Sequence, residues 1–513
     1  MKKIIVLGGG TAGWLTALYA NQQFPNDKII LIESSKIGIL GAGEGSVPIL
    51  VRLLDQLNIP VASLIKETKS TIKNSVKFTN WSNKTNSYYH HSFDMITPQL
   101  SHQALNIDSF PEGASIGRVM TVNNYKDHYD YDFVGRVSEE NKVLLNYSSN
   151  FNHEINSITN FDSHHYFSLH FDAKDLALML SKIGNERGIE RVEAEVKSFI
   201  QDKDGYVTDI VIEDGHKVKA DFVFDCSGFA RVLIGKLYNT KWKSFKENLP
   251  MKKAIPFFID IDQDNIPPYT ESIAMDYGWM WKIPLQHRYG CGYVFDSDFI
   301  SEEDAKIEVE KKLGFEVTSP KTFSFEPGVF ESVWVKNCLA VGLSSGFVEP
   351  LEATSIAQGI ILLGDFFNQK QKIFDRDERY ISYFNTKYLN ETISIRNFLY
   401  LHYMTDKTNT VFWRDFTKNN KMPEKLEEVI YHLNNAILSK DLMHEGQMGV
   451  SNYFTVAHGV GLLDKNNISN IYNAFNLDRY RDTLSAQRSL QDRFSKNFIS
   501  HSEFLRHLGG LQN

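Results

Sequence analysis

Residues 4–13 read IIVLGGGTAG, a continuous apolar run that leads directly into glycines. A run of this kind is typical of a parallel strand that is buried on both faces. A helix is expected to begin at about Thr11, and a second apolar strand, Lys28–Ile32, ends in the acid Glu33. The order strand, glycine turn, helix, strand and acid is the pattern of a dinucleotide-binding unit.

The glycines of this G-x-G-x-x-G turn have a physical role. Because glycine has no Cβ, backbone N–H groups can approach a pyrophosphate at the positive end of the helix. Glu33 is then placed to accept hydrogen bonds from an adenosine ribose. The sequence therefore predicts a dinucleotide site, in preference to a tight structural turn, with the following residues: Gly8, Gly10, Thr11, Ala12, Gly13 and Glu33.

A second strand and turn favours FAD over NAD. Residues 221–229, DFVFDCSGF, form an apolar strand that ends in Asp225, with Gly228 just beyond it. This segment is similar to the second strand–turn that FAD monooxygenase-type folds add. No second G-x-G-x-x-G unit is visible for a nicotinamide, so we expect FADH2 to come from a separate flavin reductase that binds transiently. The predicted fold is α/β: an FAD-binding, Rossmann-like fold of the GR2 or aromatic hydroxylase type, with an added β-sheet and a helical C-terminal cap.

Charge and cysteine content limit the partners. The chain has 513 residues and a net charge of -8, which argues against nucleic acid and anionic membranes. No apolar run is long enough to span a bilayer, and the apolar start is too short for a signal peptide. Cys226, Cys291 and Cys338 lie far apart, which excludes a disulfide framework or a cysteine zinc site and fits a cytoplasmic protein.

The chain is expected to consist of an FAD-binding module and a cap. The module spans 1–375, with β-rich substrate-side insertions at about 82–165 and 240–335. Alternating apolar positions between 192 and 228 predict strands and a hairpin, and 172–190 predicts a helix. Apolar residues recur at helical spacing after Pro423, so we expect 376–513 to be a mainly helical substrate cap.

Several segments resemble the flavin-dependent tryptophan halogenase family, over most of the chain. Residues 278–284, GWMWKIP, match that family's G-W-x-W-x-I-P. Residues 70–81, STIKNSVKFTNW, resemble the segment that carries its catalytic lysine. Residues 337–356, NCLAVGLSSGFVEPLEATSI, are close to its G-F-x-E-P-L-E-S-T-S/G pattern, and 41–50, GAGEGSVPIL, resemble its flavin-contacting strap.

The resemblance implies roles for particular residues. Lys73 matches the family lysine, which donates a hydrogen bond to hypohalous acid or forms a haloamine; Lys77 is a rival position. Glu352 matches the glutamate that orients the electrophile or takes the substrate proton, although an acid in a first helical turn could also be only a cap. The backbone amides of Thr354 and Ser355 match the halide site, and N–H groups at a helix start suit an anion. Which halide is preferred (chloride, bromide or iodide) stays open.

The two indoles of GWMWKIP lie two residues apart and therefore point to the same face of a strand. Trp279 and Trp281, with Pro284, are expected to form an active-site wall between the flavin and an organic substrate, rather than a plain pair of core tryptophans. A monooxygenase needs its substrate next to the flavin, whereas a halogenase needs halide there. Further expected flavin contacts come from the strap, the adenine-side strand and the third motif: Ala42, Gly43, Glu44, Val196, Gly342 and Leu343.

The substrate is less clearly defined. Where the family has S-W-x-x-V-x-x-G-M-G, this chain has Tyr453 or Phe454 in place of the tryptophan, and Val460 in place of the methionine. A small electron-rich aromatic such as an indole or phenol is expected, and residues 453 and 454 are candidate substrate contacts. Homo-oligomerisation is left open.

Two alternatives remain at this stage. An FAD-dependent aromatic hydroxylase would share the fold, but GLSSGF, residues 342–347, lacks the acid that hydroxylases carry after the corresponding glycine. A non-catalytic flavin-fold binding protein would not need the intact glycine turn. His164, His165 and His170 have no acidic or cysteine partners at matching spacing, so we expect loop or surface histidines and no metal site.

Overall fold

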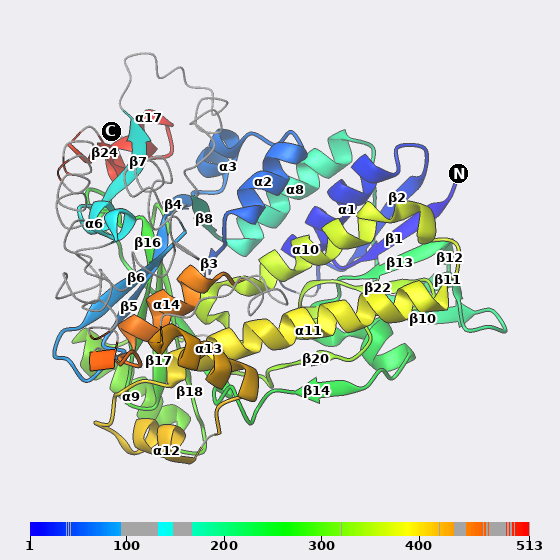
Figure 1. The fold of residues 1–513 in the computed structure, drawn as a ribbon. Coiled ribbons are helices and arrows are strands. Elements are labelled where there is room, and N and C mark those ends of the chain that lie inside the picture. Colours follow the sequence, from blue (N-terminus) through cyan, green and yellow to red (C-terminus); the bar gives the residue numbers. More distant parts are fainter. Residues whose placement is uncertain are drawn as a thin grey trace, which may run out of the picture. The chain divides into compact units, whose positions relative to one another are not determined.

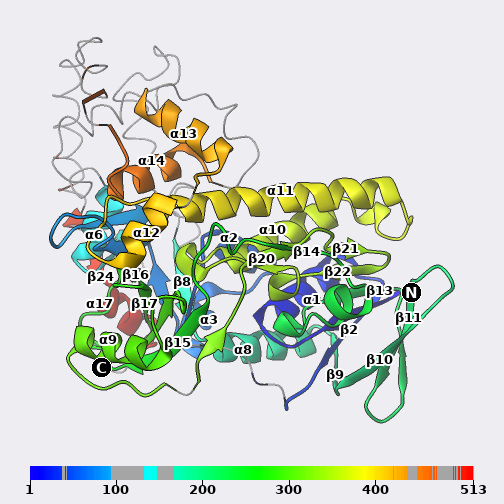
Figure 2. The ribbon, with the colours of Figure 1, turned by 90° about the horizontal axis from the view of Figure 1, so that it is seen from below.

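The computed structural model of the chain describes residues 1–36, 38, 41, 43–93, 132–146, 167–319, 321–419, 421–435, 448–464, 466–467, 470, 489, 492, 495–496 and 498–511. The chain forms two compact units (Figures 1 and 2), each made of three separate stretches. Unit 1 comprises Met1–Lys69, Phe171–Lys246 and Glu326–Ile393. Unit 2 comprises Ser70–His170, Glu247–Phe325 and Ser394–Asn513. Among the described residues, no helix is both long and apolar enough to cross a membrane.

Unit 1 is built on a six-stranded sheet in the order β21-β22-β13-β1-β2-β9. All neighbouring pairs from β22 to β9 are parallel, and β21 is antiparallel to β22. Because helices cover a parallel sheet on both faces, its central strands are buried along their length. The bounds of the strands are Lys3–Leu7 for β1, Lys28–Glu33 for β2, Glu190–Glu193 for β9, Phe222–Asp225 for β13, Trp334–Val335 for β21 and Cys338–Ala340 for β22.

Helices and a second small sheet complete unit 1. The helices are α1 (Thr11–Gln23), α2 (Ile49–Gln56), α3 (Val61–Glu67), α8 (Ala173–Glu186) and α10 (Thr354–Asn368). Helix α1 packs against α8 and α10 (Figure 1). Strands β10 (Val196–Gln201), β11 (Val207–Ile212) and β12 (Lys217–Lys219) form an antiparallel sheet, and Figure 2 shows β10 and β11 side by side. A further sheet has the order β14-β20-β23, from Trp242–Ser244, Gly328–Phe330 and Gly346–Phe347.

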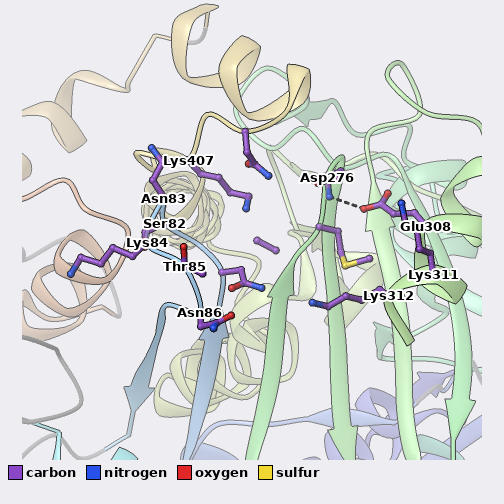
Figure 3. Close-up of a pocket in the computed structure, with 14 residues that line it drawn as sticks. Ser82, Asn83, Lys84, Thr85, Asn86, Asp276, Glu308, Lys311, Lys312 and Lys407 are labelled. Carbon is purple, nitrogen blue, oxygen red and sulfur yellow. Dashed lines mark hydrogen bonds between the residues drawn. The ribbon is translucent and has the colours of Figure 1, made fainter. Parts of the chain in front are cut away.

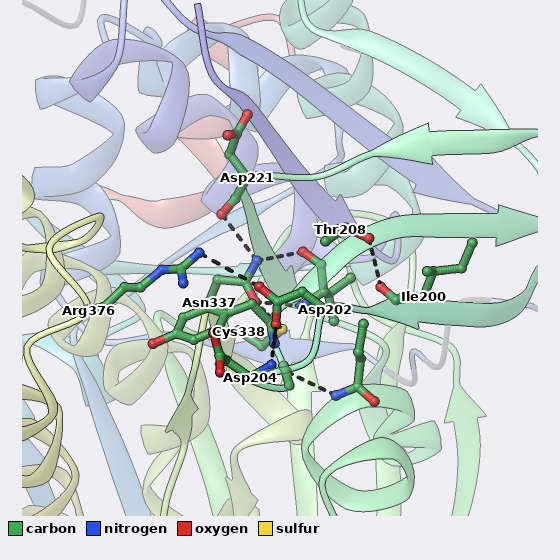
Figure 4. Close-up of polar contacts among 12 residues, drawn as sticks. Ile200, Asp202, Asp204, Thr208, Asp221, Asn337, Cys338 and Arg376 are labelled. Atoms are coloured by element: carbon green, nitrogen blue, oxygen red, sulfur yellow. Dashed lines mark hydrogen bonds and ion pairs between the residues drawn. The ribbon is translucent and has the colours of Figure 1, made fainter.

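Asn337 joins the small sheet to the large one. Its side-chain Oδ1 accepts a hydrogen bond from the Val207 N–H (2.9 Å), and its Nδ2 donates to the carbonyls of Val207 (2.8 Å) and Asp221 (3.2 Å). Figure 4 shows these contacts beside Cys338. The amide of Asn337 thus fixes the start of β22, from which residues 342–356 extend.

Unit 2 is built on a seven-stranded sheet in the order β19-β15-β18-β17-β16-β5-β6. Its pairs are antiparallel except for β16 and β5, which are parallel. The strands are β5 (Ser75–Thr79), β6 (Tyr88–Ser92), β15 (Lys253–Ile259), β16 (Tyr269–Ala274), β17 (Gly278–Pro284), β18 (Tyr289–Phe295) and β19 (Phe323–Ser324). Strands β4 (Thr71–Lys73) and β8 (Ser168–Phe171) pair antiparallel, as do β7 (Lys142–Asn146) and β24 (Phe498–Ser500).

The helices of unit 2 come from all three of its stretches. They are α6 (Phe133–Glu139), α9 (Glu302–Leu313), α12 (Val411–Asn419), α13 (Glu424–Asn434), α14 (Val450–Gly459) and α17 (His501–His507). Helix α9 buries Ala305 and Val309 against β17 and β18 in one hydrophobic core. The long helix α11 (Glu378–Tyr403) begins in unit 1 and ends in unit 2.

The predicted fold class is confirmed, including the strand, turn and helix at residues 4–13, the hairpin strands and the helix after Pro423. The sequence places the start of the cap at 376, whereas the last division between the units falls after Ile393. Helix α11 begins just after residue 376 and runs unbroken across Ile393. Residues 247–325 belong to the same unit as the C-terminal helices.

Candidate functional site

The glycine turn of unit 1 is held tightly between neighbouring strands. The Gly8 N–H donates a hydrogen bond to the carbonyl of Ile32 on β2 (2.8 Å). Gly8 has a φ of 109°, and a Cβ at this position would lie 2.3 Å from the carbonyl oxygen of Cys226. A Cβ at Gly13 would lie 1.9 Å from the carbonyl oxygen of Gly8. Gly8 therefore allows the close approach of the chain after β13, and Gly13 allows the close approach of α1 to the glycine turn.

The surroundings of Gly10 differ, because a Cβ there would meet no heavy atom within 4 Å. The neighbouring Thr11 begins α1 and is 8% exposed, and its Oγ1 has no hydrogen-bond partner among the described residues. The first N–H groups of a helix also lack partners within the helix and carry its positive dipole end. Open space, an unpaired hydroxyl and helix N–H groups fit the pyrophosphate of a dinucleotide.

Glu33 stands at the end of β2, as predicted, and a cation holds it there. Its carboxylate forms an ion pair with the Arg191 side chain of β9. Its Oε2 would lie 1.5 Å from a Cβ at Gly9, so the carboxylate covers the turn directly. Sequence reasoning missed Arg191, because only the parallel pairing of β2 with β9 brings it beside Glu33. The ribose contact of Glu33 stays a prediction.

Asp225 ends β13 and is fully buried, and its own turn uses both carboxylate oxygens. Oδ1 accepts hydrogen bonds from the N–H (3.1 Å) and hydroxyl (2.6 Å) of Ser227. Oδ2 accepts from the N–H groups of Leu233 (2.8 Å) and Ile234 (3.2 Å). The carboxylate therefore shapes the second turn, and a flavin contact by Asp225 stays a prediction.

The third motif reaches the same edge of the sheet. The N–H of Val341 donates to the carbonyl of Asp225 (2.9 Å), which carries β22 into a turn at Gly342. Gly342 has a φ of 70°, and a Cβ there would lie 2.9 Å from the Cβ of Ala12. Leu343 follows in a short 3-10 turn, Gly342–Ser344. Turns after β1, β13 and β22 thus meet at the first turn of α1, where open α/β sheets bind their ligands.

The strap residues are described in part. Ala42 lies outside the described residues, and Gly43 has a φ of 86°. Glu44 lies in the short strand β3 (Glu44–Gly45), where burial raises the pKa of its carboxyl to about 7, and the nearby Asp172 adds to the rise. Val196 begins β10 and packs against the hydrophobic core of unit 1. The flavin contacts of these residues stay predictions.

The expected helix start before Glu352 is divided into two parts. A 3-10 turn, Pro350–Glu352, comes first, and Ala353 then adopts left-handed backbone with a φ of 55°. Helix α10 begins only at Thr354. Glu352 therefore lies in the first turn of a short 3-10 helix, as expected, and Ala353 separates this turn from α10. Glu352 is 4% exposed.

Thr354 and Ser355 stand at the N-terminus of α10. Thr354 is 2% exposed, and its Oγ1 has no hydrogen-bond partner in the described part of the chain. A buried hydroxyl without a partner costs free energy unless a ligand or water supplies one. Together with the free N–H groups of the helix start, this geometry suits a small anion.

In unit 2, Lys73 ends β4 and is fully buried. Its Nζ lies 5.3 Å from the ring centroid of Phe93. The rival, Lys77, lies on β5 with its Nζ 2.7 Å from a carboxylate oxygen of Glu139, which also contacts the His90 ring (3.0 Å). The ammonium of Lys77 thus has a carboxylate partner on α6. The catalytic role of Lys73 stays a prediction.

A chain of hydrogen bonds links the lysine strand to GWMWKIP. The Thr270 hydroxyl donates to His170 Nε2 (2.9 Å), His170 Nδ1 donates to Thr71 Oγ1 (2.9 Å), and Thr71 donates to the Pro284 carbonyl (2.6 Å). Burial lowers the pKa of His170 well below its usual value, and the nearby charge of Lys73 adds to this. The neutral ring fits the tautomer that these contacts require. His170 is thus a buried strand residue, so the expectation of a loop or surface histidine is wrong for it.

His501, which sequence reasoning missed, holds the same strand from the far end of the chain. Its Nε2 accepts a hydrogen bond from the Ile72 N–H (2.9 Å), and its Nδ1 donates to the Ile266 carbonyl (3.2 Å). Burial lowers the pKa of His501 to about 3, so the ring is neutral and can accept. His164 and His165 lie outside the described residues, and no group of metal-ligating side chains occurs among those that are described.

Trp279 and Trp281 lie on one face of β17, with ring centroids 6.2 Å apart. Trp279 is 1% exposed, and its Nε1 donates to the Tyr403 hydroxyl (2.9 Å). Trp281 is partly exposed and packs closely against Gly292, where a Cβ would come within 2.1 Å of the indole. The shared face is confirmed, and the role of the two indoles as an active-site wall stays a prediction.

Tyr453 and Phe454 both lie in α14 and are 5% and 2% exposed. The Tyr453 ring packs edge-on against Phe398 at 5.2 Å, and the Phe454 ring stacks on His458 at 6.0 Å. These contacts place the two rings in the packing of α14. Their contact with a substrate stays a prediction.

The sheet of unit 1 and its three turns define an FAD-binding α/β enzyme. A sequence model of the family described as tryptophan halogenase matches residues 3–475. The chain belongs to the tryptophan halogenase family. It is a flavin-dependent halogenase, an oxidoreductase that uses reduced FAD and a halide to halogenate an aromatic substrate.

Several relatives are similar along most of their length. Tryptophan 6-halogenase SttH from Streptomyces toxytricini is 30% identical over 451 residues, which cover 83% of each chain. Tryptophan 7-halogenase RebH from Lentzea aerocolonigenes is 29% identical over 498 residues, which cover 90% of each chain. The solved structure of BrvH, a flavin-dependent halogenase from Brevundimonas sp. BAL3, matches with a TM-score of 0.84 and 26% identity over 99% of each chain.

Proposed function

We propose that Lys73 and Glu352 are the catalytic residues of this halogenase, and that its substrate is an electron-rich indole or phenol. When bound, reduced FAD and oxygen supply the oxidation of the halide to hypohalous acid. The residues of the chain hold the reactants and carry the electrophile and the proton. FADH2 comes from a separate flavin reductase, because no nicotinamide-binding turn accompanies the FAD turn in the sequence.

In unit 1, the backbone amides of Thr354 and Ser355 bind the halide. The support is the buried Thr354 hydroxyl, which has no partner among the described side chains and main-chain groups. The adjacent Glu352 is buried at 4% exposure and accepts the proton that the aromatic ring loses. FAD is held by the glycine turn, with its pyrophosphate beside Gly10 and the hydroxyl of Thr11.

In unit 2, Lys73 carries the electrophile, either by donating a hydrogen bond to hypohalous acid or as a haloamine. One observation carries this assignment: the Lys73 side chain is fully buried on a strand that Thr71 ties to Pro284 of GWMWKIP. Burial excludes water, which would otherwise consume the electrophile. A desolvated amine is also a better nucleophile than a hydrated ammonium.

The substrate proposal rests on how this chain differs from tryptophan-specific sequences. SttH and RebH are named for tryptophan. Here the aromatic positions 453 and 454 hold tyrosine and phenylalanine, and both rings are buried within the packing of α14. We therefore infer that the enzyme accepts a range of indoles and phenols and is not restricted to free tryptophan.

The test is halogenation of an indole and phenol panel by wild type, Lys73→Met and Lys77→Met, with a flavin reductase, NADH and each halide. Lys73→Met keeps the side-chain length and removes the amine, so product should fall below detection while FAD binding persists. Lys77→Met removes an amine of the same kind from the same segment, and halogenation should continue. Full halogenation by Lys73→Met would refute the assignment of the lysine. Product from wild type with NADH alone would refute the need for a separate reductase.

A further inference from the structure

Unit 2 contains an open cavity of about 560 Å³ that none of the halogenase residues lines. Its walls come from four segments: the β5–β6 connection at residues 80–86, the turn between β16 and β17, the end of α9, and residues 407 and 409. Figure 3 shows these segments around the central space.

Lys407 is the unusual residue of this cavity. It is 8% exposed, and no described residue gives its ammonium a hydrogen bond or ion pair; its backbone N–H donates to the Thr405 hydroxyl (3.0 Å). Figure 3 shows its side chain reaching into the space from one side and that of Lys312 from the other. The side chain is mostly buried and its ammonium faces the open cavity, where a second cation raises the free energy of the charged state.

Charged groups that face Lys407 do not neutralise it. Burial lowers the pKa of Lys407, and Lys312 lowers it further, while Asp276 and Asp406 act in the opposite direction. No carboxylate oxygen of these acids comes within salt-bridge distance of the Lys407 ammonium, and Asp406 already accepts a hydrogen bond from the Asn83 N–H (2.8 Å).

The remaining acid of the cavity is also engaged. Glu308 accepts hydrogen bonds from the Asp276 N–H (2.7 Å) and from the Tyr293 hydroxyl (2.8 Å). The lining holds four lysines against two acids, a surplus of positive charge on a chain whose net charge is -8. A local reversal of sign, centred on a mostly buried lysine, is the electrostatic pattern of an anion site.

We propose that this cavity binds a small phosphate-type oxyanion, either inorganic phosphate or a phosphate monoester, between Lys407 and Lys312. A dianion would give both ammonium groups a partner through charge-assisted hydrogen bonds. The volume leaves room for a small organic group beside the phosphate. None of its lining residues belongs to unit 1, where the FAD and halide sites are proposed.

The test is isothermal titration calorimetry of the FAD-saturated protein with inorganic phosphate and, separately, glycerol phosphate, at constant ionic strength in chloride. Saturation with FAD prevents phosphate from occupying the pyrophosphate position. Saturable binding in the millimolar range or tighter is expected, and Lys407→Met should weaken it at least about tenfold. Tighter binding of glycerol phosphate than of phosphate identifies an organic phosphate ligand, and equal binding identifies the free anion.

Lys306→Met is the control, because Lys306 lies on α9, the helix that carries Lys312, and is exposed in an ion pair with Glu310 (3.4 Å). It should bind phosphate as wild type does. Absence of saturable binding, or equal binding by wild type and Lys407→Met, would overturn the proposal.

A stability measurement keeps the test independent of folding defects. Without phosphate, Lys407→Met should melt at the same temperature as wild type or higher, because it removes an uncompensated charge. Phosphate should raise the melting temperature of wild type and leave that of the variant unchanged. A clear loss of stability in Lys407→Met would show that Lys407 has a partner within the protein, and the anion site would be refuted.

Discussion

His501→Ala should weaken both the fold and the halogenation step, because His501 supports the strand that carries Lys73. The His501 ring is fully buried, and its Nε2 accepts from the Ile72 N–H at 2.9 Å, one residue before the lysine. Alanine removes this acceptor and leaves the N–H unpaired inside the protein.

The structure sets the size of the effect. A buried donor without a partner costs about 1–3 kcal/mol, and the space vacated by the ring adds about 1–2 kcal/mol. The free energy of unfolding should therefore fall by about 3 kcal/mol. The kcat for halogenation should fall more than KM rises, since a displaced Lys73 affects the reaction more than substrate binding. His501→Gln, which restores an acceptor, should recover part of the turnover.

Urea unfolding and single-substrate kinetics measure the two effects, with His507→Ala as the control. His507 lies on the same helix and is exposed, and its Nδ1 contacts the Glu503 carbonyl oxygen (2.8 Å). Because the side chain is exposed, its loss should change stability by less than about 0.5 kcal/mol. If His501→Ala unfolds at the same urea concentration as wild type, the reasoning is refuted. A stability loss with unchanged kcat would show that His501 supports the fold without positioning Lys73.

The pH profile of the same proteins gives a second readout of His501. Because burial lowers the pKa of His501 to about 3, the unfolded chain binds a proton below about pH 6.5 that the folded protein does not. The contribution of the neutral His501 ring to the free energy of unfolding is therefore present above about pH 6.5 and is lost as the pH falls toward 3. As the pH falls, the free energy of unfolding should decline less steeply in His501→Ala than in wild type.

Three further predictions concern unit 1. Gly13→Ala should purify without FAD, because its Cβ would lie 1.9 Å from the Gly8 carbonyl oxygen, whereas Gly10→Ala should fold normally and bind FAD more weakly. Flavin absorbance of the purified variants tests both predictions. Retained FAD in Gly13→Ala would contradict the turn geometry. Burial raises the pKa of Glu44 to about 7, so in the FAD-free protein the folded form keeps a proton that the unfolded chain releases above about pH 4.5. Wild-type stability should therefore fall as the pH rises from about 4.5 to about 7. Glu44→Gln should flatten this decline in urea unfolding, and an identical profile would exclude the carboxyl as its source. Glu352→Gln should lower turnover by about 100-fold with an unchanged melting temperature; unaffected turnover would leave Glu352 as a structural acid.

The local parts of the fold could be predicted from the sequence. A strand, a glycine turn and a helix within residues 4–13 are set by neighbouring residues, and the structure has them where the pattern predicts. Glu33 and Asp225 were also correctly placed at strand ends. Their partners could not be predicted. Arg191 reaches Glu33 only through the pairing of β2 with β9, which lie far apart in the sequence.

The helix start near Glu352 shows the limit of a local pattern. Pro350 followed by an acid is a common beginning for a helix, and the sequence contains no glycine there to indicate a left-handed residue. Ala353 nevertheless has a φ of 55°, a conformation that alanine adopts at a cost of about 1 kcal/mol or more. Strain of this kind is usually retained where a site needs it. Here it separates Glu352 from the helix whose first amides are proposed to bind the halide.

The choice between Lys73 and Lys77 shows what a structure adds to a motif. In one continuous strand, residues four apart point to the same face, so the pattern treats the two lysines as equivalent. The structure breaks the strand at Asn74, whose N–H donates to the Pro268 carbonyl (2.7 Å). Lys73 thereby ends β4, paired with β8, while Lys77 lies on β5 within the seven-stranded sheet and meets Glu139. A single residue between two short strands thus gives one lysine a salt bridge and buries the other beside a neutral histidine.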